Sequence, residues 1–109
     1  MAKTLEFEYQ GENYTLEYTR RTVKEIENRG FSIRALRDRP MTMYPMLFEG
    51  AFLCHHRKVK EEVVNAIYKD MPDKERLAEK LVEMYNSALD TLFDEPEDES
   101  KKVEWKTNF

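Results

Sequence analysis

The chain has 109 residues, of which 40% are apolar and 37% are charged, which is typical of one small soluble globular domain. It contains no run approaching the roughly 18 apolar residues of a membrane-spanning helix, and its start lacks the apolar stretch of a secretory signal. The single cysteine, Cys54, excludes an internal disulfide framework and fits a reducing compartment.

The net charge of −4 is unevenly distributed along the chain. Residues 20–60 carry ten Lys and Arg against four acidic residues, whereas residues 61–100 carry four against thirteen. A basic block can indicate nucleic-acid binding. It can equally face the acidic block within the fold or between copies of the chain, and the acidic total favours this second interpretation.

Residues 4–18 predict a β-hairpin. Apolar and polar residues alternate in "TLEFEY" and again in "YTLEY", which is the period of a strand with one buried face. Gly11 and Asn13 between them accept the positive φ of a tight turn. Because an isolated hairpin is barely stable, we expect helices to cover its apolar face.

The segment "TRRTVKEIENRG" predicts the first helix. Thr22 followed by Glu25 fits a capping box, and Gly30 fits the left-handed residue that ends a helix. Val23 and Ile26 form its apolar edge. A short irregular or helical connection follows, and Pro40 is expected to end it.

The segment "TMYPMLFEGAFLCHH" predicts a second helix, capped by Thr42 and with Pro45 tolerated in its first turn. Gly50 lowers local helix stability by about 1 kcal/mol relative to alanine. We expect this glycine to allow the close approach of another backbone.

Two further helices are predicted in "KEEVVNAIYKDM" and "DKERLAEKLVEMYNSALDTLF", with Asp73 as the N-cap of the second. The first is expected to turn inward Val63, Val64, Ile67 and Tyr68. The apolar stripe of the second comprises Leu77, Leu81, Met84, Tyr85, Ala88 and Leu92.

These elements predict an α+β fold that is mostly α-helical, with an N-terminal β-hairpin, about four helices and a C-terminal aromatic tail. We expect one globular domain over residues 1–93, with the hairpin at 4–18 and the helices within 20–93. Residues 94–102 are acidic and predict a solvated linker. Residues 103–109, "VEWKTNF", alternate again and predict either a third strand or a docking tail.

The consecutive residues Cys54, His55 and His56 are the only cysteine and histidines of the chain. On a helix, adjacent side chains point about 100° apart, so the three cannot converge on one ion. A nucleophilic cysteine would need a base within hydrogen-bond reach and a group that orients the base. We therefore predict no metal site here, with Cys54 buried as a small hydrophobe and the histidines ending the helix.

Signatures of other enzymes are missing from the sequence. With only three glycines, the chain cannot form a glycine-rich phosphate loop, and its paired acidic residues fall on solvated faces. The sequence therefore predicts a protein that is not an enzyme and uses no cofactor.

Adaptable apolar residues are the remaining candidates for function. Six methionines are many for this length, and methionine adapts to irregular partners; the alternative is that these residues fill gaps in the core. Trp105 and Phe109 follow the linker, and aromatic residues often anchor interfaces. The candidate partner-binding residues are Met43, Tyr44, Met46, Phe48, Phe52, Trp105 and Phe109.

Three stretches carry a resemblance to a known family: "FEYQGENYTLEYTRRTVKEIENRGF", "RPMTMYPMLFEGAFLCHH" and "LVEMYNSALDTLFDEP", followed by an acidic stretch and a short aromatic tail. In the order of these stretches and in their residue patterns, the sequence resembles the small tail assembly chaperones of long-tailed, siphophage-type bacteriophages. The resemblance covers essentially the whole chain and implies a mostly helical fold.

The resemblance also implies a role. Such proteins transiently bind the long helical tape measure protein, keep it soluble, help to recruit tail tube subunits and then leave. The implied partners are therefore the tape measure and tail tube proteins, and the implied location is the cytoplasm of the host bacterium, outside the finished virion. We also expect self-association through the hairpin edge or the tail.

Two alternatives stay open. One is a permanent structural subunit of the phage tail or connector, which assembles through the hairpin edge and the aromatic tail. The other is a DNA-associated module that uses the basic block 20–60, and the acidic total argues against it.

Overall fold

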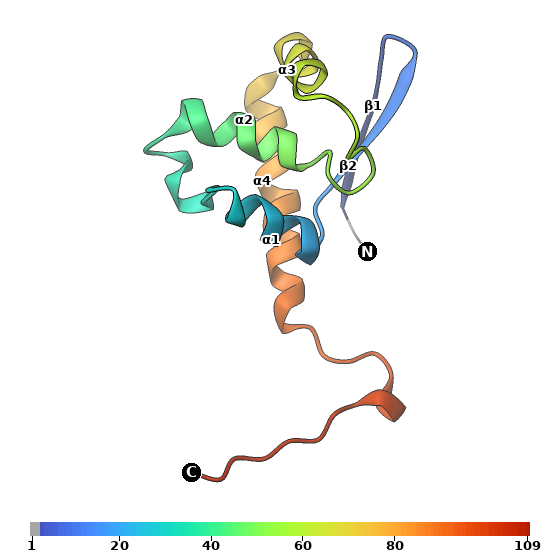
Figure 1. Cartoon of the computed structure of the whole chain (residues 1–109), viewed down its shortest axis with the longest axis vertical. Coiled ribbons are helices and arrows are strands. Elements are labelled where there is room, and N and C mark those ends of the chain that lie inside the picture. Colours follow the sequence, from blue (N-terminus) through green and yellow to red (C-terminus); the bar gives the residue numbers. More distant parts are fainter. Residues whose placement is uncertain (1–2) are drawn as a thin grey trace.

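The computed structural model describes residues 3–109 as a two-stranded sheet followed by four α-helices and an extended C-terminal segment (Figure 1). The sequence prediction of a mostly helical α+β fold is confirmed. The strands are β1 (Thr4–Tyr9) and β2 (Glu12–Glu17), and the α-helices are α1 (Arg20–Asn28), α2 (Pro40–Gly50), α3 (Glu61–Asp70) and α4 (Lys74–Asp90). Short 3-10 helices are η1 (Ile33–Leu36), η2 (Thr91–Phe93) and η3 (Glu99–Lys101).

β1 and β2 pair antiparallel, with Tyr9 opposite Glu12 at the turn. The two turn residues, Gln10 and Gly11, have φ values of 49° and 83°, which is the positive-φ pattern of a two-residue hairpin turn. The predicted hairpin is confirmed, but the expectation for Asn13 is wrong because this residue already belongs to β2 and pairs with Glu8.

The inner face of the hairpin packs on the segment that follows α2. Tyr14 and Leu16 of β2 are buried, and the ring of Phe52 packs edge-on against Tyr14 at a centroid distance of 5.8 Å. The Glu17 N–H also donates to the Ala51 carbonyl, with an N···O distance of 3.1 Å. Apolar burial and a direct backbone bond thus fasten the end of β2 to residues 51–56.

The N-cap of α1 lies three residues before the predicted cap, Thr22. Thr19 is the N-cap: its hydroxyl accepts from the Thr22 N–H, and the Thr22 hydroxyl in turn accepts from the Thr19 N–H. Thr22 therefore serves as the third helical residue of the capping box, the position that the sequence suggested for Glu25. Gly30 has a φ of 105° and ends the helical turn as predicted.

α2 also begins earlier than predicted, at Pro40 with Arg39 as the N-cap, so Pro45 lies inside the helix. The helix ends at Gly50, and residues 51–55 form turns. Gly50 packs against the side chain of Ile26 in α1, so its close neighbour is a side chain and not the backbone that we expected.

α4 is the longest helix, and α1 and α2 pack against it (Figure 1). The predicted stripe is buried from Leu77 to Ala88, whereas Leu92 lies beyond the helix and is 59% exposed. Likewise, α3 buries Val64 and Ile67 but leaves Val63 exposed. Asp73 stands at the N-cap with a left-handed backbone, but its side chain makes no capping hydrogen bond.

The core joins all of these elements through aromatic side chains. Tyr85 of α4 packs edge-on against Tyr18, which follows β2, and against Phe31, which follows α1, at centroid distances of 5.4 and 5.2 Å. Phe48 similarly contacts Phe52 and Tyr68 of α3. Within residues 3–109, every helix is too short or too polar to cross a membrane.

After α4 the chain runs away from the helical body as an extended segment (Figure 1). Residues 102–109 have no regular secondary structure, and the sheet of the described residues contains only β1 and β2. Of the two possibilities for "VEWKTNF", the third strand is therefore not formed in this structure.

Candidate functional site

The turn after α2 changes the geometry of the Cys54–His56 segment. Because the helix ends at Gly50, Cys54, His55 and His56 are not held at the 100° spacing of a helix. The prediction that these residues cannot converge depended on that spacing, so its premise is wrong. Two of the three side chains do turn toward a common point.

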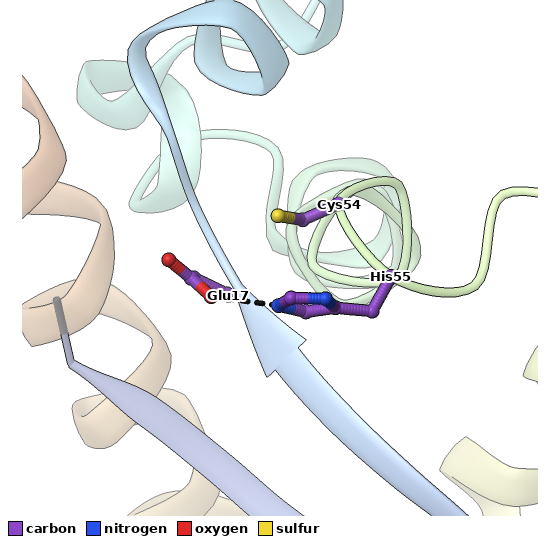
Figure 2. Close-up of side chains that lie close together, drawn as sticks. All are labelled: Glu17, Cys54 and His55. Atoms are coloured by element: carbon purple, nitrogen blue, oxygen red, sulfur yellow. Dashed lines mark hydrogen bonds and ion pairs between the residues drawn. The ribbon is translucent and has the colours of Figure 1, made fainter.

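That point is the side chain of Glu17, at the end of β2 (Figure 2). The Nε2 atom of His55 lies 2.7 Å from Glu17 Oε1, and the Cys54 thiol lies on the same side. One potential ligand atom from each of Glu17, Cys54 and His55 lies within 4.8 Å of the other two. The Glu17 and Cys54 side chains are half-buried, and His55 is exposed.

His56 has a different role. Its Nε2 accepts a hydrogen bond from the Thr15 N–H of β2 at 2.9 Å, and its ring packs on Tyr14 at a centroid distance of 5.1 Å. Burial, together with the neighbouring His55, lowers the pKa of His56. An unprotonated Nε2 is what this bond requires, so His56 is a structural residue that holds the turn to the hairpin.

Cys54 does not have the environment of a catalytic thiol. Burial raises the pKa of this thiol, and the nearby Glu17 carboxylate raises it further. A nucleophilic cysteine needs the opposite shift, because the thiolate is the reactive form. The cluster of Glu17, Cys54 and His55 therefore offers ligand atoms and not an activated nucleophile.

The candidate partner-binding residues separate into buried and accessible groups. Met43, Phe48 and Phe52 are 1%, 1% and 2% exposed and belong to the core. The expectation that these three residues bind a partner is therefore corrected, because their side chains are buried in the core. For Met43 this is the gap-filling alternative. Tyr44 and Met46 are half-buried and remain partly accessible.

Tyr44 borders an open hollow of about 650 Å³ between α2, α3 and α4. Tyr68, Lys74 and Val82 contribute to its wall, so the hollow combines apolar surface with charge at its rim. Of the candidate partner-binding residues on α2, Tyr44 is therefore the one that borders an open hollow.

The tail presents the largest exposed apolar side chains. Trp105 is 82% and Phe109 is 107% exposed, so both side chains are accessible, as a docking tail would require. Among residues 3–109, the other exposed large apolar residues are Met41, Val63, Leu92, Phe93 and Val103. Sequence analysis missed Leu92 and Phe93 as accessible residues, although the Asp94 and Pro96 that follow them signal the end of the helix.

Comparison with protein-family models finds one match, a family described as a domain of unknown function, DUF5055, over residues 1–109. The chain belongs to the DUF5055 family. Comparison with the curated proteins finds no match, and comparison with the solved structures finds none.

The basic block of this DUF5055 chain does not form one uniform surface. Arg57 and Arg29 both contact Glu25, with Arg57 making two hydrogen bonds of 2.9 and 2.7 Å to its carboxylate. Arg20 and Arg21 border a separate hollow between α1 and the end of α4. Within the fold, Glu25 thus already neutralises part of the positive charge of residues 20–60.

Proposed function

We propose that this DUF5055 chain is a tail assembly chaperone, a non-enzymatic protein that binds a phage tape measure protein and assists the recruitment of tail tube subunits. The proposal combines the family resemblance of the sequence with one structural feature, the exposed aromatic tail. Tail residues Trp105 and Phe109 lie outside the folded body, where a second polypeptide can reach them.

The tail has the chemistry that a tape measure helix would require. Such a helix carries a long apolar stripe that aggregates unless it is covered. Aromatic side chains contribute much of the binding energy in protein interfaces, and an extended segment can adjust to several registers of the stripe. The acidic residues at 94–99 separate the tail from the body and help to keep a complex in solution.

The hollow beside Tyr44 supplies a second contact surface in this proposal. It lies on the helical body, and its wall includes the apolar side chain of Val82 and the ring of Tyr68. One partner that touches both the tail and the hollow would be held more tightly than by either contact alone, because the second contact is intramolecular.

Co-expression with the tape measure protein tests the proposal. We expect the wild-type chain to raise the soluble yield of the tape measure protein, and the double variant Trp105→Asp/Phe109→Asp to lose that effect. Thr107→Asp is the matched control, because it adds a charge to the same segment without removing an aromatic ring. If the double variant gives the same soluble yield as the wild type, the tail is not part of the surface that binds the tape measure protein.

Self-association remains part of the proposal and has its own test. Deletion of residues 103–109, followed by light scattering, should lower the measured mass if the tail joins copies of the chain. An unchanged mass would exclude the tail from that contact.

A further inference from the structure

We infer that Glu17, Cys54 and His55 form a zinc-binding site that links the hairpin to the turn after α2 (Figure 2). The inference goes beyond the proposed chaperone function and does not depend on it. It stands on the meeting of three different ligand types from two segments that are far apart in the sequence.

The identity of the three ligands selects the metal. A thiolate, an imidazole and a carboxylate are the ligands that zinc uses in proteins. Magnesium and calcium prefer oxygen ligands alone, so the Cys54 sulfur argues against both. With Cys54 deprotonated and His55 neutral, Glu17 and Cys54 together supply two negative charges, which balance one divalent cation.

The distances require only a small adjustment. At zinc–ligand distances of about 2.0–2.3 Å, the ligand atoms of a tetrahedral site lie roughly 3.3–3.8 Å apart. Glu17 Oε1 and His55 Nε2 now lie 2.7 Å apart and must separate by less than 1 Å. No pair of the three ligand atoms is more than 4.8 Å apart, so the sulfur needs to approach by at most about 1 Å.

The backbone around the ligands is already held in place from both sides. The Glu17 N–H donates to the Ala51 carbonyl at 3.1 Å, and the Thr15 N–H donates to His56 at 2.9 Å. These two bonds join β2 to the turn on either side of the ligand pair Cys54–His55. Binding can therefore proceed through side-chain rotation, with little loss of backbone entropy.

Three protein ligands leave the fourth position of a tetrahedral ion to water. Glu17 also borders a hollow of about 430 Å³ between the hairpin and α4, which gives solvent access to one side of the carboxylate. A bound ion would cross-link residues 17 and 54–55, so it should stabilise the attachment of the hairpin to the helical body.

Calorimetric titration of the metal-free full chain with zinc chloride tests the site. We expect one Zn²⁺ per chain, and a cobalt-substituted protein whose spectrum contains a thiolate-to-cobalt charge-transfer band. Cys54→Ser, His55→Gln and Glu17→Gln should each weaken binding by more than about tenfold, since even the loss of an outer partner often costs that much. Glu12→Gln, which changes an exposed carboxylate in the same strand, should bind like the wild type.

Three results would overturn the inference. They are the absence of a saturable one-to-one zinc isotherm, an affinity in Cys54→Ser equal to that of the wild type, or a cobalt spectrum without the thiolate band. Circular dichroism checks that each variant is folded, and if a ligand variant does not fold, the cobalt spectrum of the wild-type chain decides.

Discussion

Gly50 of α2 lies directly against the side chain of Ile26 in α1. A Cβ atom added to Gly50 would fall 2.6 Å from Ile26 Cγ1 and closer still to Ile26 Cδ1. Ile26 is 2% exposed, so the surrounding core restricts its movement. The absence of a side chain at Gly50 is therefore what allows the side chain of Ile26 in α1 to lie directly against α2.

This contact predicts that Gly50→Ala destabilises the protein, although alanine is the better helix former by about 1 kcal/mol. Overpacking of a core typically costs about 1–3 kcal/mol. Because the added Cβ would lie 2.6 Å from Cγ1 of a buried isoleucine, we expect this cost to exceed the gain in helix propensity. Urea unfolding should show a lower free energy of unfolding for Gly50→Ala than for the wild type.

The matched background for this test is Ile26→Ala, which removes all three atoms near the added Cβ. In that background Gly50→Ala should be neutral or stabilising, because the helix propensity remains and the clash does not. A similar loss in both backgrounds would contradict the contact as the cause.

The Tyr18 hydroxyl predicts a dependence of stability on alkaline pH. It donates to the Leu47 carbonyl at 2.6 Å, and burial raises the pKa of Tyr18 well above its usual value. Burial likewise raises the pKa of Tyr85 to about 12. Because these folded-state pKa values exceed those of the unfolded chain, the stability is complete below about pH 10 and is lost as the pH rises toward the folded-state values.

Urea unfolding at several pH values above neutrality measures this loss, and Tyr18→Phe is the control. The variant should be less stable near neutral pH by about 1 kcal/mol, the typical net contribution of one hydrogen bond. It should also lose less stability at high pH, because one of the buried hydroxyls with a raised pKa is then missing. An alkaline loss as large as that of the wild type would exclude Tyr18 as a source.

The ion pair of Glu25 and Arg57 predicts that folding stability falls at acidic pH, whereas the buried tyrosines predict a fall at alkaline pH. The hydrogen-bonded Arg57 guanidinium lowers the pKa of Glu25 in the folded state. The pair therefore contributes stability above the unfolded-state pKa of the carboxylate, and this contribution is lost as the pH falls through the folded-state pKa. The difference in stability between the wild type and Arg57→Ala should shrink as the solution is acidified, and a difference independent of pH would contradict the pairing.

Local patterns in the sequence were sufficient to predict the elements of the fold. Alternation predicted β1 and β2, and helical spacing predicted the buried residues of α4 from Leu77 to Ala88. The errors fall at element ends, where several capping residues compete. Thr19 and Thr22 can both cap α1, and the capping box that forms uses Thr22 at its third position.

The cluster of Glu17, Cys54 and His55 and the hollow beside Tyr44 could not be predicted, because both depend on tertiary structure. Cys54 and His55 meet Glu17 only because α2 ends at Gly50 and the following turn packs on β2. The composition of α2 likewise could not separate buried from accessible side chains, since Phe48 and Tyr44 are both aromatic and only packing buries Phe48.

The exposure of Trp105 predicts that its fluorescence does not follow the unfolding of the helices. It is the only tryptophan, and it is 82% exposed in the folded chain. Urea should therefore leave its emission maximum almost unchanged while circular dichroism shows the helices unfolding. A large red shift on unfolding would mean that the tail is docked on the folded body in solution.

Because Trp105 is exposed, its emission also gives the most direct measurement of partner binding. A purified soluble fragment of the tape measure protein is titrated into the full chain, with the Trp105→Phe variant as the blank. We predict a saturable blue shift as the indole is buried, and weaker binding when Phe109→Asp is introduced. A folded chain whose Trp105 emission does not change, and which forms no complex with the fragment by light scattering, would contradict the proposal that this protein acts by covering the apolar surface of another polypeptide.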